Sequence, residues 1–140
     1  GISEIDPTTG MWDMICLLSE ADSNAISEVV TEKIQIQSGV TDTTTFLVAD
    51  PNESFNAIEA ANSAVYLFLK VAVGEIPKMN EALLRHLKVS AVVFGGLYDI
   101  IAKCPSEELS SVKGWLEQVS EITALRVCHP IRREATAPAS

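Results

Sequence analysis

Three cysteines and two histidines are the side chains of this 140-residue chain that could supply nucleophilic chemistry. A cysteine nucleophile needs a histidine or another base within hydrogen-bonding reach. His86 and Cys104 fall on one expected helix, where about 18 residues at roughly 1.5 Å each separate them by about 27 Å. Cys128 and His129 are adjacent, but they begin an expected tail that would not hold them in a reactive geometry. A small hydrolase or transferase with a Cys/His pair therefore ranks as the second alternative.

Metal and cofactor sites have no recognisable motif in this sequence. Zinc sites need clustered ligands such as paired CxxC elements, and Cys16, Cys104 and Cys128 are far apart. No GxGxxG, P-loop or HExxH pattern occurs, so nucleotide binding and metalloprotease chemistry have no local support. We therefore expect no metal, no cofactor and no enzymatic activity. The odd, dispersed cysteines are also no disulfide framework, which favours a reducing compartment, the cytoplasm or the nucleus.

The charge balance limits the kinds of partner. The chain carries 19 acidic and 10 basic residues, a net charge of −9, which repels phosphate and disfavours nucleic acid. A neutral or basic protein, or another copy of the chain, is the better partner. No signal segment is recognised, and the longest uncharged apolar run is about half of the roughly 20 residues that span a bilayer, so no membrane span is expected. Because residue 1 is glycine, we expect a processed chain or part of a larger protein.

Helical spacing dominates the hydrophobic pattern of the first 50 residues. Residues 6–9 (DPTT) are typical of a helix start, and an apolar stripe follows them: Met11, Trp12, Ile15 and Leu18. A second start at 22–24 precedes another stripe: Ile26, Val29, Val30 and Ile34. Between 33 and 48, the letters KIQIQ and TTTFLV leave a small β-hairpin open. We favour a loop and a short helix there, because a lone hairpin is only marginally stable.

The second half of the sequence predicts a central pair of long helices. One covers 52–73 and the other 78–103, and the letters GEIP between them place a glycine after one helix and a proline before the next. Such a short connection makes an antiparallel helix hairpin. Ser106 can cap a last, amphipathic helix. The predicted fold is therefore all-α, a compact bundle of five or six helices, with 1–127 as one domain and 128–140 as a flexible tail.

Five residues are candidates for partner binding. Gly95 and Gly96 interrupt the second long helix at a cost of roughly 1 kcal/mol each relative to alanine, so they indicate close packing of an internal helix or a groove for a partner. Trp115 lies at the edge of the last helix's apolar stripe, and tryptophan is enriched at binding hot spots. Arg85 and Lys88 form the densest basic spot, suited to an acidic peptide or a phosphate.

Together these observations favour a non-enzymatic protein-interaction or scaffold domain. The acidic charge, the expected tail and the missing catalytic motifs all fit binding, whereas no residues converge on a reaction. The first alternative is a self-assembling structural protein, a homo-oligomer or shell component, with which an acidic helical domain is compatible. The sequence leaves the partner's identity, the oligomeric state and the biological pathway open.

Overall fold

The computed structural model of the chain describes residues 2–18, 23–49, 64–87 and 90–131. In this part the strands are β1 (Ile2–Thr9), β2 (Met14–Leu18), β3 (Leu47–Val48), β4 (Ala64–Val71), β5 (Ser90–Phe94), β6 (Ile100–Pro105) and β7 (Ile122–Pro130). The helices are α1 (Ser23–Val29), α2 (Ile76–Leu87) and α3 (Leu109–Glu117). A π-helical turn, Val30–Ile34, continues α1, and a 3-10 turn, Ser106–Glu108, precedes α3.

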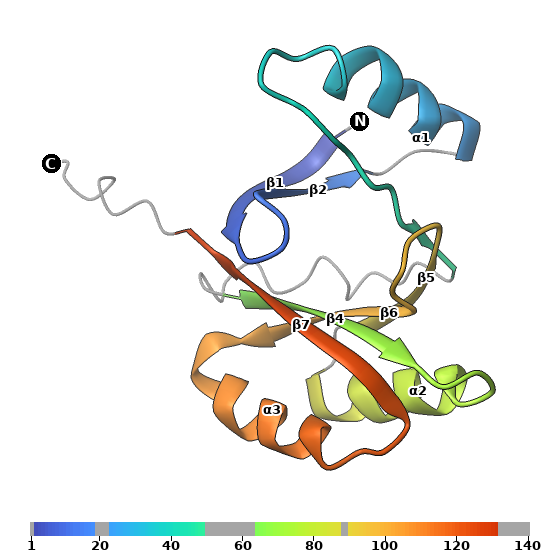
Figure 1. The fold of residues 1–140 in the computed structure, drawn as a ribbon, viewed down its shortest axis with the longest axis vertical. Coiled ribbons are helices and arrows are strands. Elements are labelled where there is room, and N and C mark those ends of the chain that lie inside the picture. Colours follow the sequence, from blue (N-terminus) through green and yellow to red (C-terminus); the bar gives the residue numbers. More distant parts are fainter. Residues whose placement is uncertain (1, 19–22, 50–63, 88–89, 132–140) are drawn as a thin grey trace, which may run out of the picture.

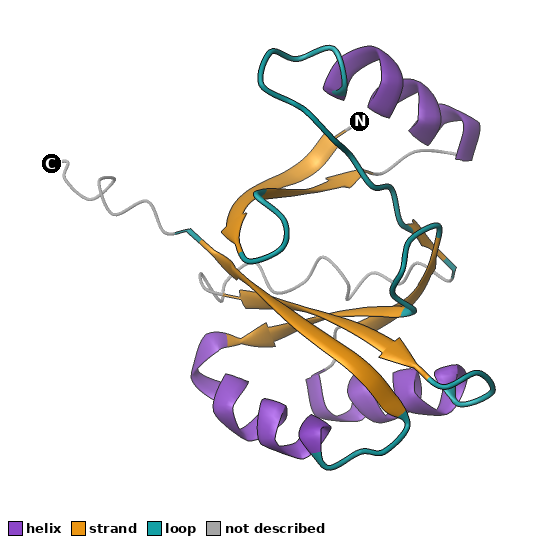
Figure 2. Cartoon of the chain, viewed as in Figure 1, coloured by secondary structure: helices purple, strands orange, loops and turns teal. Residues whose placement is uncertain are grey.

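The prediction of an all-α bundle is wrong, because the fold is mostly β. The described strands form one antiparallel seven-stranded sheet in the order β2-β1-β7-β4-β6-β5-β3. The sheet curls into a half-barrel, and the short helices lie outside it (Figures 1 and 2). None of the described helices is long and apolar enough to cross a membrane.

The segment from β4 to β7 has the order β-α-β-β-α-β, which is the split β-α-β motif. Strand β4 lies between β6 and β7 and is antiparallel to both. Each helix therefore connects two parallel strands that are separated by a third. Figure 1 shows α2 and α3 on the same face of the sheet, whereas β1 and β2 curl over the opposite face.

The helix face of the sheet holds the larger apolar core. Alternate residues of β4 point to this face, which the apolar stripes of α2 and α3 cover. The buried side chains of this core are Val65, Leu67, Leu69, Val71, Met79, Leu83, Leu87, Ile100, Ala102, Cys104, Val112 and Leu116.

The other face of the sheet is covered by the first half of the chain. Here a row of aromatic rings runs from Trp12 through Phe46 and Phe68 to Tyr98, with centroid separations of 6.5, 5.9 and 5.9 Å. These separations are typical of edge-to-face and tilted aromatic pairs. Strand β4 is thus buried on both faces, and this explains its nearly continuous apolar sequence.

The predicted central helix hairpin is replaced by strands. The described part of 52–73 contains β4, and 78–103 contains most of α2, all of β5 and part of β6. A strand buried on both faces loses its period of two, so the run AVYLFLKV could not be distinguished from a buried helix by periodicity. The first predicted helix is also wrong, because its stripe spans the β1–β2 hairpin.

Some of the other local predictions are confirmed, and others are wrong. Helix α1 with its π-helical turn follows the start predicted at 22–24, and the last helix forms as α3. The predicted cap at Ser106 is wrong, because Ser106 begins the 3-10 turn and Glu108 directly precedes α3. No hairpin forms within 33–48, since β3 pairs with β5 instead. The short helix favoured there is wrong, because residues 35–46 form turns and irregular structure before β3. Strand β7 extends through Pro130, so the first three residues of the expected tail belong to the sheet. Residues 132–140 lie outside the described part.

Candidate interaction surface

The structure describes four of the five residues predicted for partner binding and does not bring these four together. Trp115 lies on α3 and Arg85 on α2, both on the helix face of the sheet. Arg85 is exposed and pairs with Glu81 one turn away at 3.4 Å. Lys88 lies outside the described residues. Gly95 and Gly96 form the turn between β5 and β6, so they belong to a hairpin and not to a helix.

The two glycines allow another segment to pass directly over this turn. Gly95 has a φ of +100°, a conformation that side chains with a Cβ rarely adopt. A Cβ on Gly95 would lie 2.7 Å from the carbonyl oxygen of Thr45, and one on Gly96 would overlap the ring of Phe46. The glycines thus serve internal packing, as one of their two sequence interpretations proposed, but against a loop segment and not a helix.

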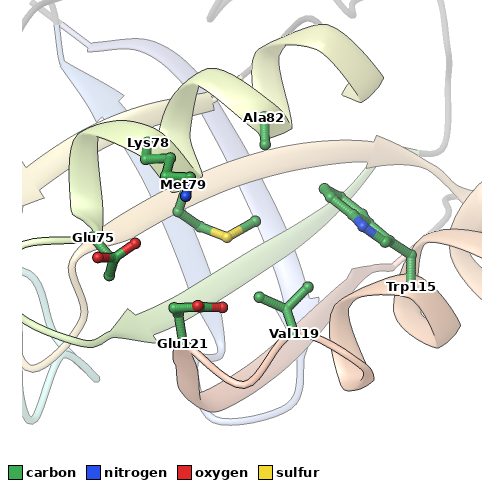
Figure 3. A pocket seen from close by; sticks show the side chains of 7 residues that line it. All are labelled: Glu75, Lys78, Met79, Ala82, Trp115, Val119 and Glu121. Atoms are coloured by element: carbon green, nitrogen blue, oxygen red, sulfur yellow. The ribbon is translucent and has the colours of Figure 1, made fainter.

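A hollow between α2 and α3 includes one predicted residue, Trp115. Its volume is about 160 Å³, and Trp115 forms one wall (Figure 3). It is lined by Glu75, Lys78, Met79, Ala82, Trp115, Val119 and Glu121. Its apolar groups come from both helices and the turn after α3.

Local sequence features fix the positions of these groups. Residues 76–87 place Met79, Leu83 and Leu87 on one stripe, which anchors α2 to the sheet. The N–H of Ala72 donates to the carbonyl oxygen of Glu121 at 2.8 Å, and the N–H of Glu75 donates to the carbonyl oxygen of Ala72 at 3.0 Å. The turns before α2 and after α3 are therefore joined, and they carry two carboxylates to the same rim.

Trp115 is held by a ring contact. Its indole lies 4.2 Å from the imidazole of His86, centroid to centroid, with 33° between the planes. The indole is half-buried against the core below it. This arrangement presents an aromatic wall of fixed orientation, which is the property that makes tryptophan effective in binding sites.

The rim of the hollow is acidic. Glu75 and Glu121 contribute two negative charges, and Lys78 contributes one positive charge. Within the described residues, none of these three side chains makes a hydrogen bond or an ion pair. A cationic group of a partner could therefore pair with a carboxylate here without first breaking an internal ion pair.

Cys104 and Cys16 lack the surroundings that activate a cysteine nucleophile. Burial, followed by the charges of Glu108 and Glu107, raises the pKa of Cys104 to about 11. Burial and then Asp6 raise the pKa of Cys16 as well. Reactive cysteines have lowered pKa values, because the thiolate is the nucleophile.

The adjacent Cys128 and His129 do not form a pair on one face of the sheet. Cys128 is buried, whereas His129 is exposed, as expected for neighbours on a strand whose side chains alternate. Among the described residues, no group of three potential metal ligands occurs.

A buried polar cluster on the concave face was missed by the sequence analysis. The hydroxyl of Tyr66 donates to Oδ2 of Asp6 at 2.5 Å. The ammonium of Lys103, a residue only 2% exposed, lies 5.4 Å from the ring centroid of Tyr66. These residues come from β1, β4 and β6, so only the pairing of distant strands brings them together. The hydrogen bond between Tyr66 and Asp6 connects the first hairpin to the sheet.

The sequence identified Trp115 but not the acidic rim around it. Glu75 and Glu121 are far apart in the chain, and each resembles an ordinary solvated carboxylate. No protein-family model, curated protein or solved structure matches this chain.

Proposed function

We propose that the chain is a non-enzymatic protein-interaction module that binds a basic segment of a partner in the hollow between α2 and α3. The observation that carries this proposal is the apolar hollow with an aromatic wall and, at its rim, two carboxylates that have no ion-pair partner among the described residues. An apolar side chain of the partner would enter between Met79 and Trp115. A neighbouring lysine or arginine would pair with Glu75 or Glu121.

The size and charge of the hollow support this kind of ligand. A volume of about 160 Å³ is suited to a single large side chain, since drug-sized ligands fill pockets of about 300–1,000 Å³. The net charge of −9 attracts a cationic segment over longer distances and raises its association rate. The raised pKa of Cys104 further favours binding over cysteine catalysis.

Selection of short random peptides on the purified chain tests the proposal. The expected peptides share one large apolar residue beside lysine or arginine. Glu121→Lys reverses one rim charge and should weaken their binding at least about tenfold, or about 1.4 kcal/mol. Glu117→Lys is the matched control, because it makes the same charge change on the exposed surface of α3, outside the hollow.

Two results would contradict the proposal. One is selection of peptides without basic residues. The other is an equal loss of binding in the Glu121→Lys and Glu117→Lys variants, because a general charge effect would then explain the binding. Ala82→Trp supplies a second check, since an indole at this position would fill the hollow and should abolish binding while the rim charges stay unchanged.

A further inference from the structure

The chain contains two copies of one arrangement of elements. The first unit is β1, β2, α1 and β3, and the second is β5, β6, α3 and β7. Both begin with a hairpin closed by an equivalent backbone hydrogen bond. The N–H of Thr8 donates to the carbonyl oxygen of Asp13 at 2.9 Å, and the N–H of Val93 donates to the carbonyl oxygen of Asp99 at 3.0 Å.

The glycines of the two turns make reciprocal contacts. Gly10 has a φ of +117°, and Gly95 has a φ of +100°. A Cβ on Gly10 would lie 2.8 Å from the carbonyl oxygen of Val127, just as one on Gly95 would lie 2.7 Å from that of Thr45. Val127 belongs to the last strand of the second unit, and Thr45 leads into the last strand of the first. Each turn therefore abuts the end of the other unit.

The strand pairing between the two units is reciprocal in the same way. The last strand of each unit pairs with the first strand of the other: Thr8 with Pro130, Thr9 with His129, Val93 with Val48 and Phe94 with Leu47. This register aligns the two units, so that Thr8 corresponds to Val93 and Pro130 corresponds to Val48. The two units are thus related by a pseudo-twofold axis.

Only the second unit has a strand and helix that complete it within the described residues. Strand β4 lies between β6 and β7, and α2 packs on the same sheet. The pseudo-twofold axis places the counterpart of β4 between β2 and β3. These two strands are the opposite edges of the sheet, and the described residues supply no strand between them. Residues 40–46, which lead into β3, have no regular structure.

Met14 and Val40, two apolar side chains at this opening, are exposed, and each is more exposed than its counterpart. Met14 corresponds to Ile100, because each follows the aspartate that closes its hairpin. Met14 is 54% exposed and Ile100 is 0% exposed. Val40 is 38% exposed, whereas Ile122, to which it corresponds, is half-buried. In the second unit this face is covered by β4 and α2.

We propose that the opening between β2 and β3 binds one β-α segment of a partner polypeptide. This site lies apart from the hollow between α2 and α3, and it does not depend on the function proposed for that hollow. The second unit defines the occupant's chemistry. It is an extended strand that is apolar on both faces and antiparallel to both edges, followed by an amphipathic helix with an apolar stripe like that of α2.

The chain's own β4-α2 segment is the probe for this site. A second copy of residues 64–89 replaces residues 1–4, so that it ends directly before Ile5. Ile5 corresponds to Ser90 when the two units are aligned by their strand register. If the added copy occupies the opening, amide hydrogen exchange in β2 and β3 should slow at least about tenfold. Oxidation of Met14 by peroxide should slow as well. The control carries Leu67→Asp and Leu69→Asp in the added copy alone, which removes two buried apolar side chains from the strand.

Equal rates of amide hydrogen exchange in β2 and β3 of the two extended chains would overturn the proposal. If the extended chain is insoluble, a synthetic peptide of residues 64–87 added to the unmodified chain gives the same two readouts. If this peptide does not protect the amides of β2 and β3, the proposal is overturned as well. Protection of β2 and β3 that rises with the concentration of the unmodified chain alone would also overturn it, because a second copy would then fill the opening.

Discussion

Replacement of Gly95 by alanine tests the crossing of the β5–β6 turn by the segment that leads into β3. A non-glycine residue at positive φ costs about 1–2 kcal/mol, and a Cβ placed 2.7 Å from a backbone oxygen adds an overpacking cost of about 1–3 kcal/mol. The loss of unfolded-state entropy returns about 0.4–1 kcal/mol. We therefore expect Gly95→Ala to lower the free energy of unfolding by about 3 kcal/mol, within a range of about 1–4.6 kcal/mol.

Two other glycines separate the contributions to this value. Gly39 has a φ of +94° but has no atom within 4 Å of an added Cβ, so Gly39→Ala reports backbone strain alone, about 1 kcal/mol. Gly114 lies on α3 with neither strain nor contact, so Gly114→Ala should stabilise the chain by about 0.5–1 kcal/mol.

Urea unfolding of the three variants, followed by circular dichroism, provides the comparison. Gly95→Ala should be clearly less stable than Gly39→Ala. If the two variants lose the same stability within about 0.5 kcal/mol, the close approach of Thr45 to the turn is refuted. The pseudo-twofold relation between the two units would then lose one of the two reciprocal turn contacts that support it.

Three further predictions concern the core. Tyr66→Phe removes the hydrogen bond to Asp6 and should cost about 1–2 kcal/mol in urea unfolding; a loss below about 0.5 kcal/mol would show that this bond does not hold the first hairpin. Leu83→Ala, at a fully buried position of α2, should cost about 2–5 kcal/mol; a change smaller than about 1 kcal/mol would contradict the packing of α2 on the sheet. The pKa of Cys104 is raised in the folded chain from its usual 9.0 to about 11, so its stabilising contribution is complete below pH 9 and is lost as the pH rises to 11. The stability difference between the chain and its Cys104→Ala variant should shrink over that interval, and a constant difference would refute the raised pKa.

The sequence predicted amphipathic helices more reliably than strands. Residues 106–117 and 23–34 have one apolar stripe and a polar face, and this pattern identifies a helix without knowledge of its neighbours. Strand β4 gives no such signal, because the helices cover one of its faces and the first half of the chain covers the other. Its burial on both faces is a tertiary property, and it produces an apolar run that a buried helix shares.

The candidate surface was predictable only in part. Trp115 could be selected by residue type and by its place at the edge of a stripe. The carboxylates beside it could not, because Glu75 and Glu121 meet through a hydrogen bond between two distant turns. The glycine pair was correctly associated with close packing, but its neighbour was unknown until the pairing of β3 with β5 was seen. Which residues meet at these two places thus depends on contacts between segments that are distant in the sequence.

The indole N–H signals of the two tryptophans provide the most direct test of the proposed binding surface. Trp115 lines the hollow between α2 and α3, whereas Trp12 packs among the aromatic rings on the opposite face of the sheet. A selected basic peptide is added to the ¹⁵N-labelled chain and the spectrum is recorded during the titration. Binding in the hollow should shift the Trp115 signal and leave the Trp12 signal in place. A shift of Trp12 with Trp115 unchanged would show that partners bind elsewhere on the molecule.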